Sequence, residues 1–441
     1  LSAALTESGI NWRSPNDFFE SSDEFDFSDE THWKNLFDVF IRDKVNPTTF
    51  VFCPELRNFS CNGDVAIQTL SPMIFLGRYL GATFFSAELT VAVVVENLTD
   101  SPRNLPADVF LGPIRVLPQE FQNVNTGLIE VSIKSQSTSM SLGQSLVRDI
   151  AALDGSNHLL RVGRLLLEET YPSISLDRPQ GIPKLLRHGG VYLITGGLGR
   201  IGTTLASHLI DTVDAKVILT TRGRLGEVNE FPLKTRHPNN VLVLTANAES
   251  EVEMFDALNR GVSEFGNING VIHAAGIIGA ASFKTISESS IEDHGRQFEG
   301  KVGGLPIIEK LSQKVNLDFV VLCSSLSPLL GGLGFSAYGS ANAILDRYVD
   351  EKSGDPGPIW ISINWEGWQE LAAPDAVGHE FGKNELTDEE GCDIFDRIMD
   401  QSNVSRIVVS TTGLSGRLQK WVSGKPAQPE KSSIGQTFSR P

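Results

Sequence analysis

Residues 317–348 read LDFVVLCSSLSPLLGGLGFSAYGSANAILDRY and contain a strand signal, a loop and a helix signal. The run Phe319–Cys323 is apolar and rich in β-branched residues, which predicts a strand buried on both faces of a parallel sheet. The next periodic segment predicts a helix that begins near Tyr338. Its inward face would carry Ala341, Ile344, Leu345 and Tyr348. Ser324 and Ser325 at the strand end, with a tyrosine at the helix start, suit the polarisation of a carbonyl group.

A second glycine-rich stretch follows a predicted strand at Gly190–Ile194. It reads Thr195-Gly196-Gly197-Leu198-Gly199-Arg200-Ile201-Gly202 and leads into a helix with one apolar face. Glycines allow a tight turn, let the backbone approach a diphosphate, and let the helix pack close to the strand. By itself this spacing is equally consistent with a turn that binds nothing, but the flanking strand and helix favour a dinucleotide site.

The next predicted strand, Lys216–Thr220, ends in Thr221-Arg222-Gly223-Arg224. An enzyme that uses NAD would place an acidic group here for the ribose hydroxyls, whereas a 2′-phosphate needs hydroxyl and guanidinium donors. The predicted cofactor is therefore NADPH, with Arg222 as the phosphate ligand, Thr221 beside it and Arg224 as a helper. Without the glycine turn, an exposed basic turn would be an equally good interpretation.

Tyr338 and Asn342 are four residues apart and therefore lie on the same side of the predicted helix. This segment resembles the short-chain dehydrogenase/reductase family, which carries Tyr-x-x-x-Lys here and a serine upstream. Asn342 stands where that lysine is expected. The ketoreductase domains of modular polyketide synthases make this exchange and take the lysine from an earlier helix. The segment HGRQFEGKVGGLPIIEKL matches it at Lys301, and the intervals from Lys301 to Ser325 and from Ser325 to Tyr338 agree with that subfamily.

The resemblance implies a role for each of these four residues in ketone reduction. Tyr338 would be the general acid, and Ser325 would donate a second hydrogen bond to the same oxygen. Lys301 would supply positive charge that favours the tyrosinate, and Asn342 would hold the lysine or the proton relay. Taken singly, each residue type also has an ordinary structural role, as a core tyrosine, a capping serine or a surface lysine.

The resemblance also assigns two more segments to the cofactor site. After the predicted strand Val241–Thr245, Asn247 and Ala248 stand where related domains have Asp-Val against the adenine, and the Asn247 carboxamide can still accept a hydrogen bond. The run Gly270–Gly276 resembles the fourth-strand signature of the family. Its small residues Ala274, Ala275 and Gly276 would make room for the nicotinamide ribose. We interpret His273, within this strand, as a hydrogen-bonded structural residue.

We predict an α/β fold with two Rossmann-like halves. Residues 1–30 would be an acidic linker, residues 31–183 a truncated structural subdomain without a glycine-rich phosphate loop, and residues 184–425 an NADPH-binding catalytic subdomain with a doubly wound parallel sheet. Residues 426–441 would be a C-terminal linker. The strands expected in the structural half are Thr49–Phe52, Leu89–Val95 and Leu128–Val131. The segment Gly112–Val131 is similar to a characteristic segment of such structural halves.

The C-terminal part of the chain contains a predicted last strand within Pro358–Trp368. The irregular stretch up to about Leu386 is predicted to be a lid over an acyl substrate. Thr387 and Glu390 form a capping box at the start of a helix. This helix would turn Ile394, Phe395, Ile398 and Met399 inward.

The substrate that the resemblance implies is a β-ketoacyl chain carried as a phosphopantetheine thioester on an acyl carrier protein. Two sequence fingerprints of product handedness in this family have no match, because Ile278-Gly279-Ala280 replaces Leu-Asp-Asp and Leu330 replaces tryptophan. Three alternatives stay open. The chain could reduce an α-ketoacyl group in a peptide synthetase or hybrid, could be a catalytically silent structural domain, or could be a short-chain reductase or epimerase acting on free small molecules.

The chain has 441 residues and a formal charge of −17, which argues against a nucleic-acid surface. It has no apolar run long enough to span a bilayer, so we expect a cytoplasmic protein. It starts at Leu1 without an initiating methionine, which indicates a piece of a larger multidomain enzyme with neighbouring domains as partners. The four cysteines lack metal-ligand spacing and are expected to be free thiols, with Cys53 and Cys61 as the alternative disulfide.

Overall fold

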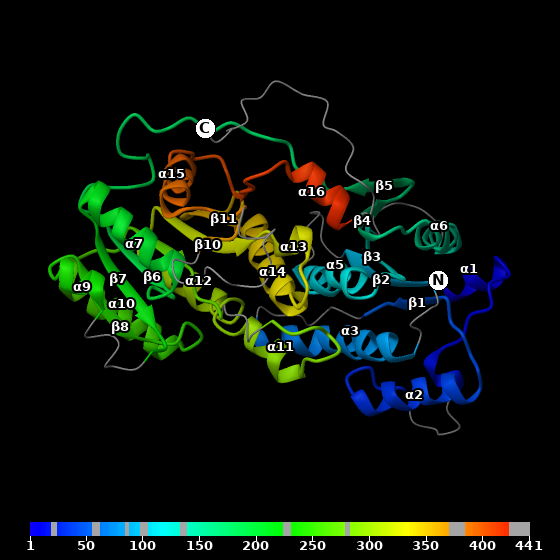
Figure 1. Ribbon diagram of the computed structural model, residues 1–441. Helices are drawn as coiled ribbons and strands as arrows, with labels where there is room; N and C mark the ends of the chain where they lie inside the picture. Colours follow the sequence, from blue (N-terminus) through cyan, green and yellow to red (C-terminus); the bar gives the residue numbers. More distant parts are fainter. Residues whose placement is uncertain are drawn as a thin grey trace. The chain divides into compact units, whose positions relative to one another are not determined.

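A computed structural model describes residues 1–18, 24–54, 62–83, 88–97, 105–132, 139–223, 231–277, 283–369 and 384–422. The chain forms two compact units, each assembled from several segments (Figure 1). The first comprises Leu1–Glu169, Ile277–Gly303 and Ser327–Glu351, and the second Thr170–Gly276, Gly304–Leu326 and Lys352–Pro441. The boundary is therefore crossed several times by the chain.

The first unit is built around a five-stranded sheet in which the strands follow one another in chain order. Its strands are β1 (Thr49–Phe52), β2 (Leu89–Asn97), β3 (Val124–Ser132), β4 (Ser156–Val162) and β5 (Leu165–Glu168). The first four are parallel, and β5 pairs antiparallel with β4. Its helical segments are α1 (Ser2–Glu7), η1 (Pro15–Phe18), α2 (Glu30–Arg42), α3 (Gly63–Thr83), α4 (Leu105–Asp108), α5 (Leu111–Glu120), α6 (Ser139–Ala151), α11 (Ile291–Phe298), α13 (Ser327–Leu330) and α14 (Ser336–Lys352).

Helix α6 covers one face of this sheet, because its residues Leu146 and Ile150 pack in one cluster with Ala92 and Val94 of β2. Helix α5 packs against β3 and α13, and α3 packs against α11. The segment predicted to be an acidic linker contributes α1, which packs on α6, and a buried Phe25.

The second unit contains a seven-stranded parallel sheet in the order β12-β11-β10-β9-β6-β7-β8. Its strands are β6 (Val191–Thr195), β7 (Lys216–Thr221), β8 (Val241–Thr245), β9 (Gly270–His273), β10 (Phe319–Ser325), β11 (Ile359–Trp365) and β12 (Arg406–Val408). Its helices are α7 (Arg200–Val213), α9 (Pro232–Arg236), α10 (Glu251–Phe265), α12 (Leu305–Lys314), α15 (Asp388–Met399) and α16 (Leu414–Trp421). The strand order reverses direction between β6 and β9, which is the position where such sheets bind nucleotides at the carboxyl ends of their strands.

Helices cover both faces of this sheet. Helices α7 and α15 pack together on one face, where Tyr192 and Ile194 of β6 join their buried side chains in one core cluster. The alternate residues of the strands point to the opposite face of the sheet. There α10 packs so closely on β7 that a Cβ on Gly261 would be 2.2 Å from the Cδ1 of Ile218. The capping box of α15 forms as predicted, with Thr387 and Glu390 bonded to each other's backbone N–H groups.

The predicted α/β fold with parallel sheets is confirmed, and most strand predictions hold within one or two residues. β1 and β8 have the predicted bounds, and β10 extends the predicted strand to Ser325. Helix α14 begins at Ser336, near Tyr338 as predicted, and the Phe335 carbonyl accepts a hydrogen bond from the Gly339 N–H. One prediction needs correction. The strand expected to be the last, β11, is followed by β12, which pairs with it at the sheet edge.

Several predictions fall on positions outside the described residues. These are residues 370–383 of the predicted lid, the predicted linker 426–441, Arg224 as a second ligand of the 2′-phosphate, the Ile278-Gly279-Ala280 segment at the place of the Leu-Asp-Asp fingerprint, and Cys61. Cys53, Cys323 and Cys392 form no disulfide. Cys323 is buried in β10 as the apolar run predicts, whereas Cys53 is exposed. Among the described residues, no helix combines the length and the apolar character needed to cross a bilayer.

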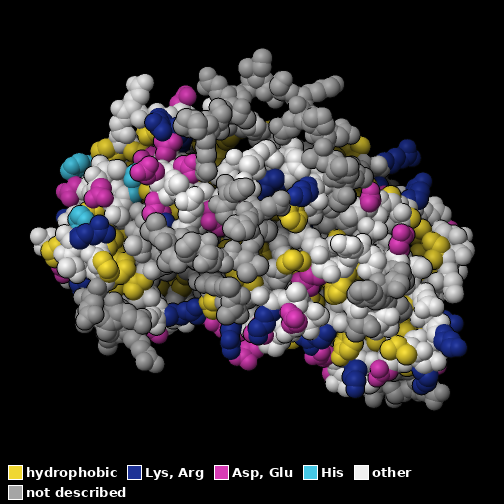
Figure 2. All heavy atoms as spheres, in the orientation of Figure 1, with side chains coloured by type: hydrophobic (Ala, Val, Ile, Leu, Met, Phe, Trp, Pro, Cys, Tyr) yellow, Lys and Arg dark blue, Asp and Glu magenta, His cyan; other side chains and the backbone are white. Residues whose placement is uncertain are grey.

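Acidic side chains and histidines gather over the region that α7 and α15 occupy, on the face shown in Figure 2. The carboxylates of α15 include Asp388, Asp393 and Asp396, each paired with a cation. The pairs join α15 to α7 through Arg200 and His208. Part of the acidic charge of the chain is thus neutralised locally where these two helices pack.

Candidate active site

Three of the four predicted catalytic residues, Lys301, Tyr338 and Asn342, lie in the first unit and form one cluster. Lys301 and Asn342 are buried, with 4% and 0% of their surface exposed. The Lys301 Nζ donates a hydrogen bond of 3.0 Å to the Asn342 Oδ1 and lies 5.6 Å from the centre of the Tyr338 ring. The Asn342 Nδ2 donates a 2.8 Å hydrogen bond to the Tyr338 carbonyl. Asn342 therefore fixes a buried cation beside the phenol ring.

The Tyr338 ring also packs against two phenylalanines. The centroids of Phe283 and Phe335 each lie 5.5 Å from the Tyr338 centroid in edge-to-face geometry. The two phenylalanine rings are 4.4 Å apart, so all three rings are in mutual contact. Because edge-to-face packing favours one orientation of each ring, this cluster restricts the direction of the Tyr338 side chain.

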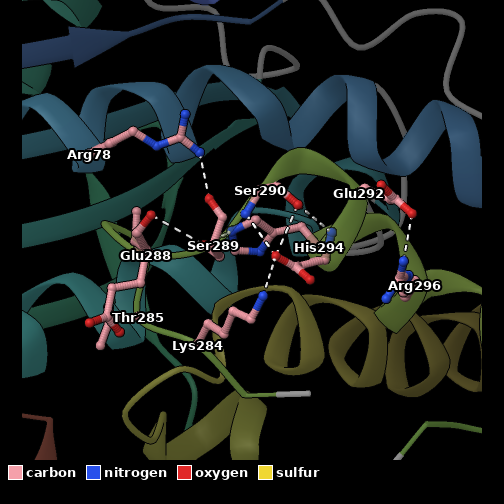
Figure 3. Close-up of polar contacts among 11 residues, drawn as sticks. Arg78, Lys284, Thr285, Glu288, Ser289, Ser290, Glu292, His294 and Arg296 are labelled. Carbon is pink, nitrogen blue, oxygen red and sulfur yellow. Dashed lines mark hydrogen bonds and ion pairs between the residues drawn. The ribbon is translucent and has the colours of Figure 1, made fainter. Parts of the chain in front are cut away.

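The segment that leads to Lys301 is fixed by a network of polar contacts (Figure 3). Arg78 of α3 reaches the Ser289 carbonyl at 2.6 Å, and the Ser289 hydroxyl hydrogen bonds to the His294 Nε2 at 2.6 Å. Burial, reinforced by the charge of Arg78, lowers the pKa of His294 to about 4, so this imidazole is neutral at pH 7. Lys301 follows α11 by three residues, so these contacts hold the backbone that carries its side chain.

Helix α14, which carries Tyr338 and Asn342, is anchored along its length. A Cβ on Gly112 of α5 would lie 1.7 Å from the Ser336 carbonyl oxygen, so only glycine allows α5 and α14 to cross this closely. One turn further along, the Ser340 hydroxyl donates a 2.5 Å hydrogen bond to the Val109 carbonyl. The predicted structural half thus contacts the helix of Tyr338 directly.

Near the C-terminal end of α14, Arg347 pairs with the buried Asp108 at 2.5 Å and lies 3.5 Å from Glu130 of β3. Burial raises the pKa of Asp108 to about 6, and the guanidinium of Arg347 opposes this rise. Glu130 also contacts His158 of β4 at 2.8 Å. Buried charges need such partners, so this network links the position of α14 to the sheet of the first unit.

Ser325, the fourth predicted catalytic residue, lies in the second unit as the last residue of β10. The Asn364 Nδ2 of the neighbouring strand β11 donates hydrogen bonds to the Ser325 carbonyl at 2.8 Å and to the Ser324 Oγ at 3.1 Å. These contacts engage the backbone of Ser325 and fix the end of the strand. The residue thus has a defined backbone position at the carboxyl edge of the parallel sheet.

The glycine turn after β6 has the geometry that its sequence predicts. Gly196 adopts a φ of +64°, and a Cβ there would lie 2.6 Å from the Ala274 carbonyl oxygen. A Cβ on Gly202 would be 2.6 Å from the Gly196 oxygen, so α7 packs tightly against the turn. Gly199 is the N-cap of α7 and has no side chain to cap the helix. The first backbone N–H groups of a helix lack intrahelical partners and bind anions.

Most side chains of the turn are engaged within the protein. The Thr195 Oγ1 lies 2.7 Å from the His273 Nδ1, which confirms the prediction of a hydrogen-bonded structural histidine. Arg200 pairs with Asp388 at 2.6 Å, and Leu198 and Ile201 pack against the hydrophobic core. Any contact between these residues and a diphosphate would therefore come mainly from the backbone.

The predicted determinants of the adenosine end follow β7 and β8. The Thr221 Oγ1 accepts a 3.1 Å hydrogen bond from the Gly223 N–H, and Arg222 between them is exposed. After β8, the Asn247 Oδ1 accepts from the Glu249 N–H at 3.3 Å, and Ala248 is buried. The carboxamide oxygen is thus partly used by the local turn.

Four residues around Tyr338 were not predicted from the sequence. Phe283 and Phe335 contact its ring, and Gln119 and Glu120 of α5 bind the loops that carry these two phenylalanines. Gln119 and Glu120 lie inside the segment that was given only a structural role, and single polar residues there carry no periodic signal. Phe335 could have been found, because residues three apart at the start of a helix lie on the same face, which places Phe335 next to Tyr338. Phe283 lies far from Tyr338 in the chain, and no local pattern indicates their contact.

The seven-stranded parallel sheet and the glycine turn after β6 are features of the short-chain dehydrogenase/reductase fold. Residues 190–370 match the family model described as the KR domain. Over these residues the chain is similar to the ketoreductase (KR) domain family, which confirms the predicted resemblance to the ketoreductase domains of modular polyketide synthases. Domains of this family bind nicotinamide cofactors.

Curated relatives include polyketide synthase PksM of Bacillus subtilis, which is 30% identical over 264 residues, covering 56% of this chain and 6% of that protein. Polyketide synthase ThaG of Burkholderia thailandensis is 28% identical over 273 residues, covering 57% of this chain and 5% of that protein. The chain thus spans only a small part of the relatives it matches, which are large multidomain synthases.

Solved structures with the same fold include an N-terminal ketoreductase from the macrolactin assembly line. It has a TM-score of 0.70 and 21% identity, covering 92% of this chain and 82% of that one. Another is a multidomain structure with adenylation, ketoreductase and pseudo Asub domains from a keto acid-selecting NRPS module. It has a TM-score of 0.75 and 16% identity, covering 92% of this chain and 35% of that one.

Proposed function

We propose that this chain uses NADPH to reduce the β-keto group of an acyl chain bound to an acyl carrier protein, with one stereochemical outcome, and gives a β-hydroxyacyl thioester. The observation that carries the proposal is the buried cluster in which Asn342 holds the Lys301 ammonium beside the Tyr338 ring. A buried cation needs compensation, and a phenol that must become anionic during a reaction provides it.

Tyr338 serves as the general acid. A phenol with a pKa of about 10 readily gives its proton to a forming alkoxide, which is far more basic. The tyrosinate left behind is stabilised by the ammonium of Lys301, whose Nζ lies 5.6 Å from the ring centre. Ser325 keeps the role that the resemblance gives it, as a hydroxyl donor to the carbonyl oxygen.

The residues at the carboxyl edge of the sheet in the second unit fit a nicotinamide dinucleotide. The turn at Gly196, where a Cβ would meet the Ala274 carbonyl, and the N-terminus of α7, whose cap residue Gly199 has no side chain, support a diphosphate site. We assign Gly197, Leu198, Gly199, Arg200, Ile201 and Gly202 to this diphosphate together with Thr195. Thr221 and Arg222 would hold the 2′-phosphate, Asn247 and Ala248 the adenine, and Ala274, Ala275 and Gly276 the nicotinamide ribose. When bound, NADPH supplies the hydride.

The partners in this proposal are an acyl carrier protein that presents a phosphopantetheine-linked ketoacyl chain and the neighbouring domains of a multidomain synthase. The length of the relatives supports it, because each carries the matched region as a small part. A cytoplasmic location belongs to the same proposal, since the acidic composition contains no apolar segment long enough for a membrane span.

The test follows the absorbance of NADPH while the protein is supplied with β-keto or α-keto acyl thioesters. We expect oxidation of NADPH with the β-keto thioester and a much slower reaction in Tyr338→Phe. Turnover of only the α-keto thioester would instead establish the peptide-synthetase alternative. An absence of turnover with both would indicate a catalytically silent domain.

A further inference from the structure

The loop before Tyr338 contains three glycines in backbone conformations that other residues rarely adopt. Gly331, Gly332 and Gly334 have φ values of +73°, +136° and +77°. Such a segment loses more conformational entropy on ordering than an ordinary loop, so something must hold it in place. The contacts that do so come from the C-terminal end of α5, within the same compact unit.

Gln119 of α5 binds this loop with both ends of its carboxamide. Its Nε2 donates a 2.6 Å hydrogen bond to the Leu330 carbonyl, and its Oε1 accepts a 2.8 Å hydrogen bond from the Gly332 N–H. A Cβ on Gly331 would lie 2.6 Å from the Gln119 Nε2, so the loop backbone lies directly against this side chain.

Glu120, the next residue, joins the glycine loop to a second loop. Its Oε1 accepts a hydrogen bond from the Gly334 N–H at 3.3 Å, and its Oε2 accepts one from the Ile286 N–H at 2.9 Å. Burial raises the pKa of Glu120 to about 6 against the effect of these two hydrogen bonds, and the nearby carboxylate of Glu288 adds to the rise. At pH 7 the side chain is therefore mainly a carboxylate, which accepts from both loops at once.

The two loops held by Glu120 deliver the two rings that contact Tyr338. Phe335 directly follows Gly334, and Phe283 lies three residues before Ile286. Both rings are 5.5 Å from the Tyr338 ring, measured between centroids. A continuous chain of contacts thus runs from one carboxylate through two loop backbones to the side chain of the proposed general acid.

We propose that Gln119 and Glu120 are positioning residues that clamp the two loops beside Tyr338 and thereby set the orientation of its ring. The proposal rests on the proposed function, because it assigns the clamp a purpose in proton transfer by Tyr338. Neither residue touches the reacting atoms in this scheme. The clamp also gives helix α5, which belongs to the predicted structural half, an indirect part in the chemistry through the orientation of Tyr338.

The first test is amide hydrogen exchange in the whole chain, which needs no cofactor and no substrate. In Glu120→Ala, we expect exchange at the Ile286 and Gly334 amides to accelerate at least about tenfold, because their acceptor is lost. In Gln119→Ala, the Gly332 amide should accelerate instead. Glu292→Ala is the matched control, since Glu292 is an exposed glutamate of α11 paired with Arg296. It should change none of these three amides.

The second test is activity. Glu120→Ala should lower kcat about tenfold or more, since a small misplacement of a catalytic group is costly, while the affinity for NADPH measured by fluorescence stays unchanged. Glu120→Gln keeps the size of the side chain and one acceptor oxygen. This variant should therefore accelerate exchange at only one of the two amides and lose less activity, and it covers the case in which Glu120→Ala fails to fold.

The outcomes separate the clamp from the proposed function. Exchange rates at Ile286 and Gly334 that do not change in Glu120→Ala would overturn the clamp whatever the activity. Wild-type kcat in Glu120→Ala, together with faster exchange, would show that the clamp does not position Tyr338. A wild-type protein that reduces no keto thioester would remove the proposed function, while the exchange pattern would still decide whether the two loops are held by Gln119 and Glu120.

Discussion

The Nζ of Lys301 and the Oδ1 of Asn342 are joined by a 3.0 Å hydrogen bond inside the protein, although the two residues belong to different segments of the chain. Asn342 lies one turn after Tyr338 on α14 and holds the Lys301 ammonium there. The cation therefore reaches this position from another segment, without a lysine at position 342. The same Asn342 uses its Nδ2 to bind the Tyr338 carbonyl at 2.8 Å, which ties the lysine to the backbone of the proposed acid.

Replacing Tyr338 by Phe should lower kcat by roughly 10²-fold to 10⁴-fold, the range expected for loss of a general acid. The phenyl ring keeps the contacts with Phe283 and Phe335, so the melting temperature should stay close to that of the wild type. Stopped-flow measurement of NADPH oxidation and a thermal melt would check both. A variant that retains full turnover would rule out Tyr338 as the proton donor.

The hydrogen bond between Lys301 and Asn342 should appear as an energetic coupling. Asn342→Leu removes the acceptor of a buried ammonium and should reduce the free energy of unfolding by about 2 kcal/mol. With Lys301→Met added, the total loss should be smaller than the sum of the two single losses by about 1 kcal/mol. Urea unfolding of the wild type, the two single variants and the double variant measures this coupling free energy.

The control for this cycle is an exposed ion pair. Lys310 pairs with Glu251 at 2.5 Å on the surface, where both side chains are half exposed. Lys310→Met should change the free energy of unfolding by less than about 1 kcal/mol, because solvent screens such pairs. Additive losses in the Lys301 and Asn342 cycle would contradict the coupling.

Arg222 should determine the preference for NADPH over NADH. In Arg222→Ala, we expect kcat/KM for NADPH to fall about tenfold or more, since a charge-assisted contact to a phosphate is lost, while kcat/KM for NADH stays within about twofold. Steady-state kinetics with both cofactors gives the ratio of kcat/KM for NADPH to kcat/KM for NADH. Arg260→Ala, at another exposed arginine, should leave the ratio unchanged, and an equal ratio in both variants would show that Arg222 does not bind the 2′-phosphate.

Gly112 should tolerate no side chain, because a Cβ there would lie 1.7 Å from the backbone oxygen of Ser336. Gly112→Ala should therefore reduce the free energy of unfolding by about 3 kcal/mol, the upper end for overpacking, and lower kcat by displacing α14. Gly295→Ala is the contrasting change, since a Cβ there meets nothing within 4 Å in helix α11. It should stabilise the protein by up to about 1 kcal/mol in a denaturant titration.

The stability of the second unit should depend on pH through His208 of α7. Burial acts to lower its pKa, but the hydrogen bonds to Asp396 and Cys392 dominate and raise the pKa from 6.5 to about 10. The folded protein therefore binds a proton that the unfolded chain loses above pH 6.5, so this stabilisation is fully present below that pH and is lost as the pH rises through about 10.

His208→Gln should accordingly lower the free energy of unfolding at pH 6 by on the order of 2 kcal/mol, and the difference should shrink toward pH 10. Chemical denaturation across this range would measure it. His237→Gln is the control, because His237 lies 4.0 Å from its acidic partner Asp211. A constant difference between the wild type and His208→Gln at all pH values would refute the proposed ion pair with Asp396.

Much of the fold could be predicted because its signals are local. The apolar run at Phe319–Cys323 became the central part of β10, and the run at Val241–Thr245 became β8 without change. Strand β12 was missed because three residues are too few for a pattern, and it forms only through its pairing with Ser362–Asn364 of β11. Helix α14 begins near Tyr338 as its apolar periodicity predicts, and the Phe335 carbonyl accepts one of its first backbone hydrogen bonds.

The sequence by itself determined the parallel α/β architecture and the glycine turn before α7, because apolar periodicity and glycine spacing act over neighbouring residues. The candidate catalytic residues came from the resemblance of their motifs to a known family. Only the tertiary structure decided that Lys301 bonds to Asn342 and that Gln119 and Glu120 hold the two loops beside Tyr338. A hydrogen bond needs its two atoms within about 3 Å. For residues far apart in the chain, that distance is set by the packing of whole helices and loops and leaves no repeating signal in the sequence.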